Sequence, residues 1–267
     1  MAAPSSSYGA VPLVPGAEPL PELDVPSPGR QHRLTVLLRL LLLLPHAVLL
    51  AVLGVVTFCV AVVAWVATLI LGRVPDSLEQ WLAGYVGYAT RFDAAAMLLT
   101  DRYPPFQVLG EPGGYPVQVR LRSTALNRVA VFFRLLLVIP AAVLASLAVA
   151  GWWAVALVSW IVVLVLGRMP LPLFEATAAV VRYRMRVSAY LLLLTSAYPK
   201  RLFGDQSSAD AVIGIVRGPS ATRPLMLGTA GRVLVGVFLL LGVAGWAGNA
   251  VGYEPSPAQA GTERVSP

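Results

Sequence analysis

The sequence predicts an all-α integral membrane protein, built from two tandem helical-hairpin repeats with interfacial amphipathic helices plus one C-terminal transmembrane helix. Three observations predict this class: 57% of the 267 residues are hydrophobic, only 12% are charged, and one long segment occurs twice. Soluble domains carry about 25% charged residues, and a soluble fold of this size cannot hide so much apolar surface. Lipid takes up the excess.

The repeat appears when the chain is shifted by 95 residues against itself. Arg33–Pro104 then matches Arg128–Pro199 without a gap, and 30 of the 72 positions are identical. Shared apolar composition does not explain the match, because rarer residues coincide as well. They include Arg39/Arg134, Pro45/Pro140, Trp65/Trp160, Gly72/Gly167, Arg73/Arg168, Tyr88/Tyr183 and Arg91/Arg186. The duplication therefore defines two equivalent units.

Changes in composition divide the chain into six segments. We expect a Pro/Ser-rich disordered cytoplasmic tail at 1–29, followed by repeat unit 1 at 30–107 and repeat unit 2 at 115–203. A linker at 204–229 leads to the C-terminal transmembrane helix at 230–252, and a disordered tail fills 253–267. The first tail has no basic residue before Arg30, so it does not have the pattern of a secretory signal.

Each unit opens with an uncharged run of 32 residues, Leu40–Leu71 and Leu135–Leu166. One helix of that length measures about 48 Å, against a hydrocarbon core of about 30 Å. A hairpin with its turn near the middle keeps every basic residue from Arg30 to Arg232 on one side, as the positive-inside rule favours. We therefore expect two crossings per run and parallel repeats, with the N-terminus cytoplasmic and the C-terminus extracellular. A single long helix and a shallow re-entrant segment are the alternatives.

An amphipathic segment follows each run, Leu78–Leu99 in the first unit and Phe174–Leu194 in the second. The second carries Arg182, Arg184 and Arg186 near its middle, and each central charge costs about 2.5–3.5 kcal/mol on insertion. We expect both segments to lie flat at the interface. The alternative is a platform packed under the bundle.

Two short β-strands are expected outside the helices. Tyr115–Arg122 alternates apolar and polar residues, and Asp210–Val216 is a second β-like run that we expect to be its partner. In the last span, Val233–Val251, the small residues Ala244 and Gly248 begin a four-residue spacing that continues to Gly252. This spacing permits a close helix contact, or ordinary packing.

Several motifs at the ends of the runs are similar to those of a known family. Arg39-Leu-Leu-Leu-Leu-Leu-Pro45, Gly72-Arg73-Val-Pro75 and Leu99-Thr-Asp-Arg-Tyr-Pro-Pro-Phe106 resemble the domain-of-unknown-function 4389 family of bacterial membrane proteins. The second copy matches at Arg134 to Pro140, Gly167-Arg168-Met-Pro170 and Arg182-Tyr183, but departs at Leu194-Thr-Ser-Ala-Tyr-Pro-Lys200. The resemblance covers about Arg33–Phe203 and implies a multi-pass membrane location in actinobacteria-like organisms, with no activity to carry over.

The candidate site residues are mainly basic. The net charge is +7, and the arginines lie at the edges of apolar runs, which favours anionic lipid headgroups over nucleic acid. The candidates for headgroup contact or membrane anchoring are Arg39, Arg73, Arg91, Arg134, Arg168 and Arg186. His46, inside the first run, is the candidate polar intramembrane residue; the alternative is a neutral imidazole bonded to a backbone carbonyl.

No pattern predicts catalysis, a metal or a cofactor. Neither His32 nor His46 recurs in the second unit, Cys59 is the single cysteine, and no phosphate-binding glycine loop is present. We therefore expect a non-catalytic scaffold or accessory protein of the cell membrane. Its expected partners are anionic lipids and a second copy or another membrane protein. The alternative is a small transporter or channel with a path between the units, in which His46, Thr68 and Ser159 face a shared interior.

Overall fold

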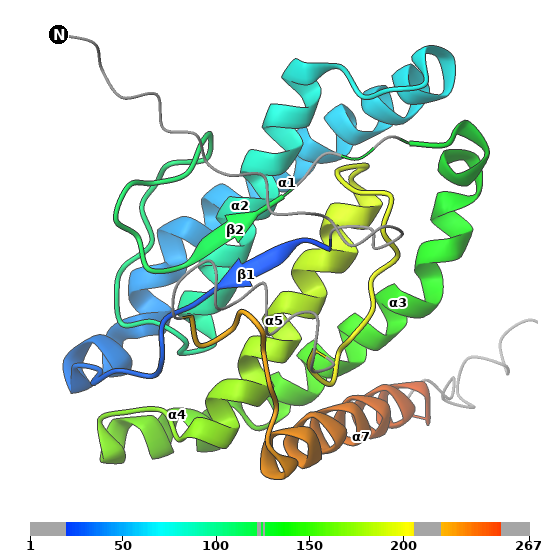
Figure 1. Cartoon of the computed structure of the whole chain (residues 1–267). Helices are drawn as coiled ribbons and strands as arrows, with labels where there is room; N and C mark the ends of the chain where they lie inside the picture. Colours follow the sequence, from blue (N-terminus) through cyan, green and yellow to red (C-terminus); the bar gives the residue numbers. More distant parts are fainter. Residues whose placement is uncertain (1–19, 122–123, 125, 206–219, 252–267) are drawn as a thin grey trace, which may run out of the picture.

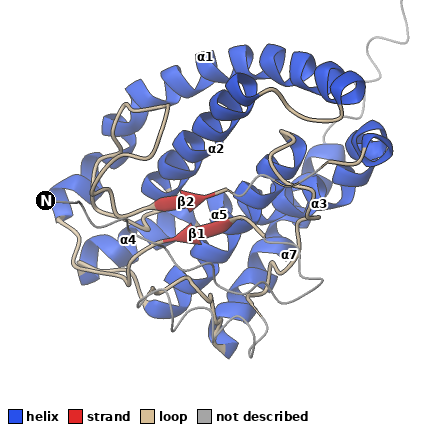
Figure 2. Cartoon of the chain, turned by 45° about the horizontal axis from the view of Figure 1, so that its top comes forward, coloured by secondary structure: helices blue, strands red, loops and turns tan. Residues whose placement is uncertain are grey.

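The computed structural model describes residues 20–121, 124, 126–205 and 220–251, and these residues are mostly helical (Figure 1). Three helices are long and apolar enough to cross a membrane, which confirms the all-α membrane class. Figure 2 shows a small two-stranded sheet on one side of the helices. The elements are β1 (Glu22–Asp24), α1 (Arg33–Leu71), α2 (Asp76–Ala96), β2 (Gln118–Arg120), α3 (Arg128–Ala154), α4 (Ala156–Leu166), α5 (Leu171–Leu191) and α7 (Thr229–Val251).

The first uncharged run forms part of one continuous helix, α1, which has 39 residues. The turn expected near its middle is absent, so the prediction of two crossings within this run is wrong. The run contains no polar turn residues, and an apolar backbone satisfies its own hydrogen bonds best as a helix. Gly54 alone weakens helix formation by about 1 kcal/mol, and Pro45 lies inside the helix without ending it.

The second run has one interruption, at Val155 between α3 and α4. The Val155 N–H donates to the Trp152 carbonyl at 3.1 Å, and helical bonding resumes from Ser159 N–H to the Val155 carbonyl at 2.9 Å. One residue therefore leaves the helix, and α4 continues away from α3 instead of folding back (Figure 1). We call α1 and the α3–α4 pair the two long arms.

Each unit is an antiparallel helix pair, but its turn lies at the end of the uncharged run. Gly72 and Gly167 end the arms in the left-handed conformation, with φ of 77° and 65°. Their N–H groups donate to the Thr68 and Val163 carbonyls at 2.8 Å each. A glycine at this position carries no Cβ penalty, and the proline three residues after it cannot continue the arm. The repeated Gly-Arg-x-Pro motif is therefore a helix stop.

The two arms run antiparallel and contact each other at both ends through equivalent tryptophans. The Trp160 indole N–H donates to the Val36 carbonyl at 2.7 Å, and the Trp65 indole N–H donates to the Val131 carbonyl at 3.1 Å. Each donor and each acceptor is the repeat equivalent of the other. This exchange defines a pseudo-two-fold axis perpendicular to the arms, and it replaces the expected pair of parallel hairpins.

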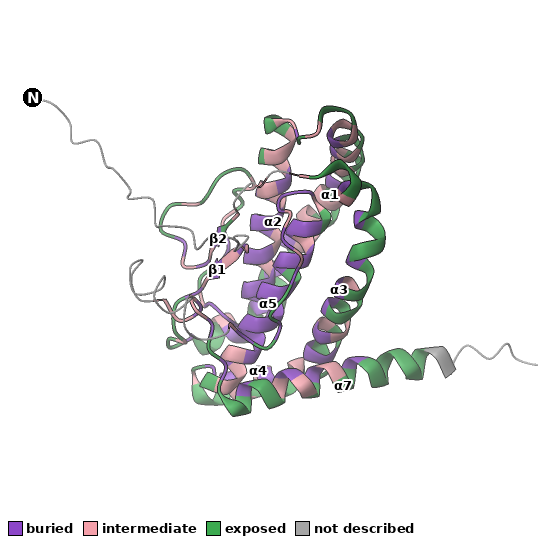
Figure 3. Ribbon diagram, turned by 45° about the vertical axis from the view of Figure 1, so that its right-hand side comes forward, coloured by how far each residue is buried: buried purple, intermediate pink, exposed green. Residues whose placement is uncertain are grey.

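The amphipathic helices α2 and α5 contact each other, and Figure 3 shows them between the arms and the strands. α5 also contacts α3 and α7, and most of its residues are buried, including Arg182 and Arg186. The prediction that this segment lies flat on lipid is wrong, because protein covers the faces that would meet headgroups. The alternative, a platform packed under the bundle, agrees with its contacts to other helices, although α5 is buried among α2, α3 and α7.

The strand expected in Tyr115–Arg122 exists as β2, and its partner among the described residues is β1. β2 pairs antiparallel with β1, so that Leu23 lies opposite Val119. The predicted disorder of 1–29 is therefore wrong for the described residues 20–29, where Leu23 and Val25 are buried. Thr222 holds this segment by accepting from the Val25 N–H at 2.9 Å and donating to the Leu23 carbonyl at 2.8 Å. The run Asp210–Val216 lies outside the described residues.

α7 crosses α3 where two glycines remove side chains from the contact. A Cβ at Gly151 would lie 1.6 Å from the Phe238 carbonyl oxygen, and a Cβ at Gly242 would lie 2.1 Å from the Leu147 carbonyl oxygen. The four-residue spacing does not make this contact, because Ala244 and Gly248 are exposed; Gly252 lies outside the described residues. The sequence spacing could not identify the contact, because its second glycine is on another helix.

We expect Gly242→Ala to lower the free energy of unfolding by about 1–3 kcal/mol, because α3 and α7 must move apart to admit the methyl group. Thermal unfolding in detergent measures the change. Gly245→Ala is the matched control, since a Cβ there meets nothing within 4 Å and alanine favours a helix by about 1 kcal/mol. Equal effects of the two substitutions would contradict the close crossing.

Candidate functional site

Arg39 is buried and joins the start of α1 to the end of α2. Its Nη1 donates to the Ala95 carbonyl at 3.0 Å and to the Thr100 carbonyl at 2.7 Å. Ala95 lies in the last turn of α2, where carbonyl groups lack helical partners and the helix dipole is negative. The guanidinium group therefore caps the C-terminus of α2 from a neighbouring helix.

Arg134 makes the same contacts one repeat later. It donates to the Tyr190 carbonyl at 2.9 Å and to the Thr195 carbonyl at 2.7 Å, at the end of α5. Leu98 and Leu193 occupy the left-handed region in both turns, each with φ of 64°. A non-glycine residue in this region costs about 1–2 kcal/mol, so the buried arginine stabilises a strained turn. We call these two contact sets the arginine locks.

The two arginine locks balance their charge differently. In the first unit, the Asp101 carboxylate lies 3.2 Å from Arg39 Nη2 and accepts from the His32 N–H at the start of α1, also at 3.2 Å. In the second unit Ser196 replaces this aspartate, and the Arg134 guanidinium instead lies 4.2 Å from the centre of the Tyr190 ring. A cation–π contact therefore takes the place of an ion pair.

Arg91 and Arg186 are also buried and bind carbonyl groups. Arg91 donates to Gln107 at 2.7 Å, whereas Arg186 donates to Pro21 and Lys200 at 3.1 Å each. Burial is the main cause that lowers the pKa of Arg186, to about 9. Four of the six candidate arginines thus lie inside the protein, where headgroups do not reach them.

Arg73 and Arg168 differ from the other four candidates because both are exposed. Each follows the glycine that ends a long arm. At the end of α4, the backbone of Arg168 pairs with that of Arg30 in an isolated antiparallel β-bridge. The Gln31 N–H donates to the Gly167 carbonyl at 2.8 Å. The structure therefore leaves only these two candidates in a position to contact a membrane surface.

His46 is fully buried within an aromatic cluster of the first unit. Its Nδ1 is hydrogen-bonded to the Tyr88 hydroxyl, and its ring stacks on Phe106 with centroids 3.9 Å apart. Tyr103 contacts the ring edge-on at 4.7 Å. The partner is a side-chain hydroxyl rather than the backbone carbonyl considered from the sequence, and Nε2 has no hydrogen-bond partner within the described chain.

The residues Thr68 and Ser159 do not share an interior with each other. Ser159 precedes Trp160, which binds the start of α1 at Val36, whereas Thr68 lies near the other end of α1 and donates to the Ala64 carbonyl at 2.6 Å. Residues 36 and 68 of one helix are about 48 Å apart. The predicted common interior is therefore absent.

Sequence reasoning missed the polar contacts that join distant segments. Asp205 accepts from Arg182 at 2.6 Å and from the Leu225 N–H at 3.0 Å, which links α5 to the chain preceding α7. Asp93 on α2 accepts from Arg184 on α5 at 3.1 Å. Neither aspartate is repeated, so the duplication gave no signal for them. Among the described residues no group of three or more His, Cys, Asp or Glu could hold a metal ion.

Asp93 titrates unusually because it is buried between the two units. Burial raises its pKa to about 6, and the positive charge of Arg184 opposes this rise. Arg184 offsets it only in part, because its side chain is 45% exposed. The protonated carboxyl is thus favoured by folding, and stability falls as the pH rises from the unfolded pKa, about 4, to the folded one.

We expect Arg39→Met and Arg134→Met each to lower the free energy of unfolding by about 2–4 kcal/mol, because two buried carbonyls lose a charged donor. Denaturation in detergent measures the loss. Arg73→Met is the matched control, and its exposed side chain predicts a change within about 0.5 kcal/mol. A similar effect at all three positions would contradict the arginine locks.

We expect Asp93→Asn to remove a pH dependence of stability between about pH 4 and pH 6. Raising the pH across this window should destabilise the wild-type protein relative to the variant by about 3 kcal/mol. Unfolding curves at pH 4, 5, 6 and 7 test this, with Asp76→Asn at the exposed start of α2 as the control. Parallel curves for the wild type and Asp93→Asn would show that folding does not raise the pKa of Asp93.

The comparisons with known proteins agree with the duplication. The profile of the family described as domain of unknown function 4389 matches residues 33–107 and again residues 128–202. No curated protein and no solved structure gives a significant match. Because the two matches cover more than half of the chain and coincide with the two units, the protein belongs to the domain-of-unknown-function 4389 family, in two tandem copies.

Proposed function

We propose that this chain is a non-catalytic membrane scaffold or accessory protein. The observation that carries the proposal is that residues repeated in both units make equivalent structural contacts. Arg39 and Arg134 cap α2 and α5, which we call the return helices. Trp65 and Trp160 join the ends of the arms, and Gly72 and Gly167 end the arms. What the two copies share is thus a set of structural contacts, as a scaffold requires. We call the two arms together with α2 and α5 the frame.

The charge distribution supports a cell-membrane location with the basic residues in the cytoplasm. Arg73 and Arg168 stand exposed where the arms end, and we assign them contact with anionic lipid headgroups. The N-terminus is then cytoplasmic, and α7 carries the C-terminus outside the cell. The exposed apolar faces of the arms offer lipid, a second copy or another membrane protein a surface to contact.

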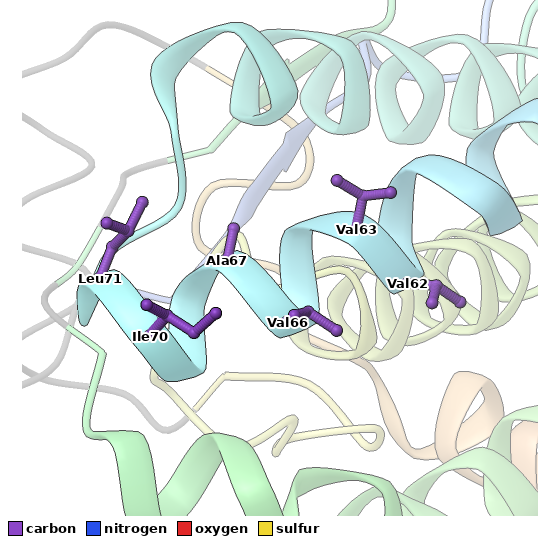
Figure 4. A pocket seen from close by; sticks show the side chains of 6 residues that line it. All are labelled: Val62, Val63, Val66, Ala67, Ile70 and Leu71. Atoms are coloured by element: carbon purple, nitrogen blue, oxygen red, sulfur yellow. The ribbon is translucent and has the colours of Figure 1, made fainter.

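A transporter is the second candidate, and the buried His46 favours it, because polar groups inside membrane segments often mark a pathway. Two observations weigh against it. His46 has no counterpart in the second unit, where Ala141 stands. The groove in Figure 4 is lined only by apolar side chains of α1, from Val62 to Leu71, and lies on the outside of that helix.

We expect the purified chain in vesicles of phosphatidylglycerol and phosphatidylcholine to leave proton and potassium fluxes at the level of empty vesicles. Fluorescent pH and potassium indicators inside the vesicles measure both fluxes. The His46→Ala protein serves as the matched comparison. A flux well above background that His46→Ala abolishes would overturn the scaffold proposal and establish the transporter.

A further inference from the structure

The ends of the two arms carry exposed arginines at both sides of the frame. The first end joins the start of α1 to the end of α4 and exposes Arg30, Arg33 and Arg168; the second joins the end of α1 to the start of α3 and exposes Arg73 and Arg128. Arg33 Nη2 donates to the Val165 carbonyl at 3.3 Å within the first end. The pseudo-two-fold axis therefore relates Arg33 and Arg168 at the first end to Arg128 and Arg73 at the second, so both ends expose arginines.

An upright arm does not fit a bilayer in length or in charge. α1 has 39 residues and is about 58 Å long, nearly twice the hydrocarbon thickness of about 30 Å. Its exposed surface is apolar almost throughout, from Leu34 to Leu71. If the arms crossed the membrane, their two basic ends would also face opposite compartments, against the positive-inside rule.

The frame has one apolar face and one polar face. In Figure 3 the exposed turns of α1 and α3 lie on the right-hand side of the molecule, and the buried turns of α2 and α5 lie between them and the strands. Exposed leucine and valine side chains cover the arms, among them Leu41, Val55, Leu136 and Val143. The face with β1 and β2 carries charged residues such as Arg120, which is exposed.

α7 indicates where the arms meet the membrane. Its 23 residues measure about 34 Å, enough for one crossing of the hydrocarbon core. It meets α3 at Gly242, ten residues after the exposed Arg232 and therefore about 15 Å along the helix. An α7 that spans the membrane thus brings the α3–α4 arm into contact with the bilayer near this crossing.

We propose that the frame inserts into the membrane from one side: both arm ends lie at the same anionic headgroup layer, the arms enter the hydrocarbon from that side, and α7 alone crosses. The lipid partner is an anionic leaflet, whose phosphates the arginines at the two ends contact. This proposal rests on the membrane scaffold function and specifies its orientation.

Single cysteines in a Cys59→Ser background test the orientation in intact cells with a membrane-impermeant maleimide. Gly29→Cys reports the first end, Ser77→Cys the second end and Val55→Cys the middle of α1, while Gly261→Cys follows α7. We expect Gly29→Cys and Ser77→Cys to react only after permeabilisation, Val55→Cys to remain unreactive in both conditions, and Gly261→Cys to react at once.

Two other outcomes would overturn one-sided insertion. Labelling of Gly29→Cys or Ser77→Cys, but not both, in intact cells would establish crossing arms with inverted repeats. Labelling of Val55→Cys from outside would establish a turn in the middle of the run. A flux in the vesicle assay would instead remove the scaffold function and leave the orientation unaffected, so the two proposals fail separately.

The lipid contact has its own measurement on the purified full chain. We expect Arg73→Gln combined with Arg168→Gln to reduce co-purified phosphatidylglycerol several-fold relative to phosphatidylethanolamine. Arg120→Gln combined with Lys200→Gln removes the same charge from exposed positions away from the arm ends and should leave the ratio unchanged. Equal losses in both pairs would show that net charge alone retains the lipid, and would overturn the assigned contact.

Discussion

The arginine locks are the constraint on which both units depend. A guanidinium buried near the start of each arm donates to a carbonyl group at the end of the return helix and to a second one in the turn that follows it. An arginine suits this place because it stays charged and presents several donors in a fixed plane. Without the lock, these carbonyls would lose a charged donor beside a strained leucine, and the arm would lose this contact with the return helix.

The frame then follows from the exchange between the units. The tryptophan of each arm donates to a backbone carbonyl of the other arm, so the ends of each unit are held by contacts with the other unit. The return helices meet in the middle, where Asp93 and Arg184 form an ion pair between α2 and α5. Duplication thus produced one body in which the return helices of the two units contact each other, and the unrepeated contacts of Asp93 and Asp205 distinguish the two halves. α7 adds to this body through a crossing that depends on the absence of side chains at Gly151 and Gly242.

The same arrangement explains why residues that look alike in sequence serve different purposes. Six arginines lie next to apolar residues in the two repeats, yet four are buried and two are exposed. A sequence shows that an arginine lies next to an apolar run. It does not show whether the guanidinium group binds a backbone carbonyl or is exposed to water. His46 illustrates the same limit: its position inside an apolar run was evident, whereas its partner Tyr88 lies 42 residues away on the next helix.

The sequence by itself determined the membrane class, the two units and the helix stops, because these depend on composition, on identity in one register and on the local chemistry of Gly-Arg-x-Pro. Only the tertiary structure decided that the uncharged runs are long arms, that β1 pairs with β2, and that α5 lies in the interior. Length and charge rules could not decide the first point, because they describe a helix against a flat bilayer and not against a partner helix. The other two depend on contacts between residues far apart in the chain, and their physical basis is burial in a space that exists only once both units are assembled.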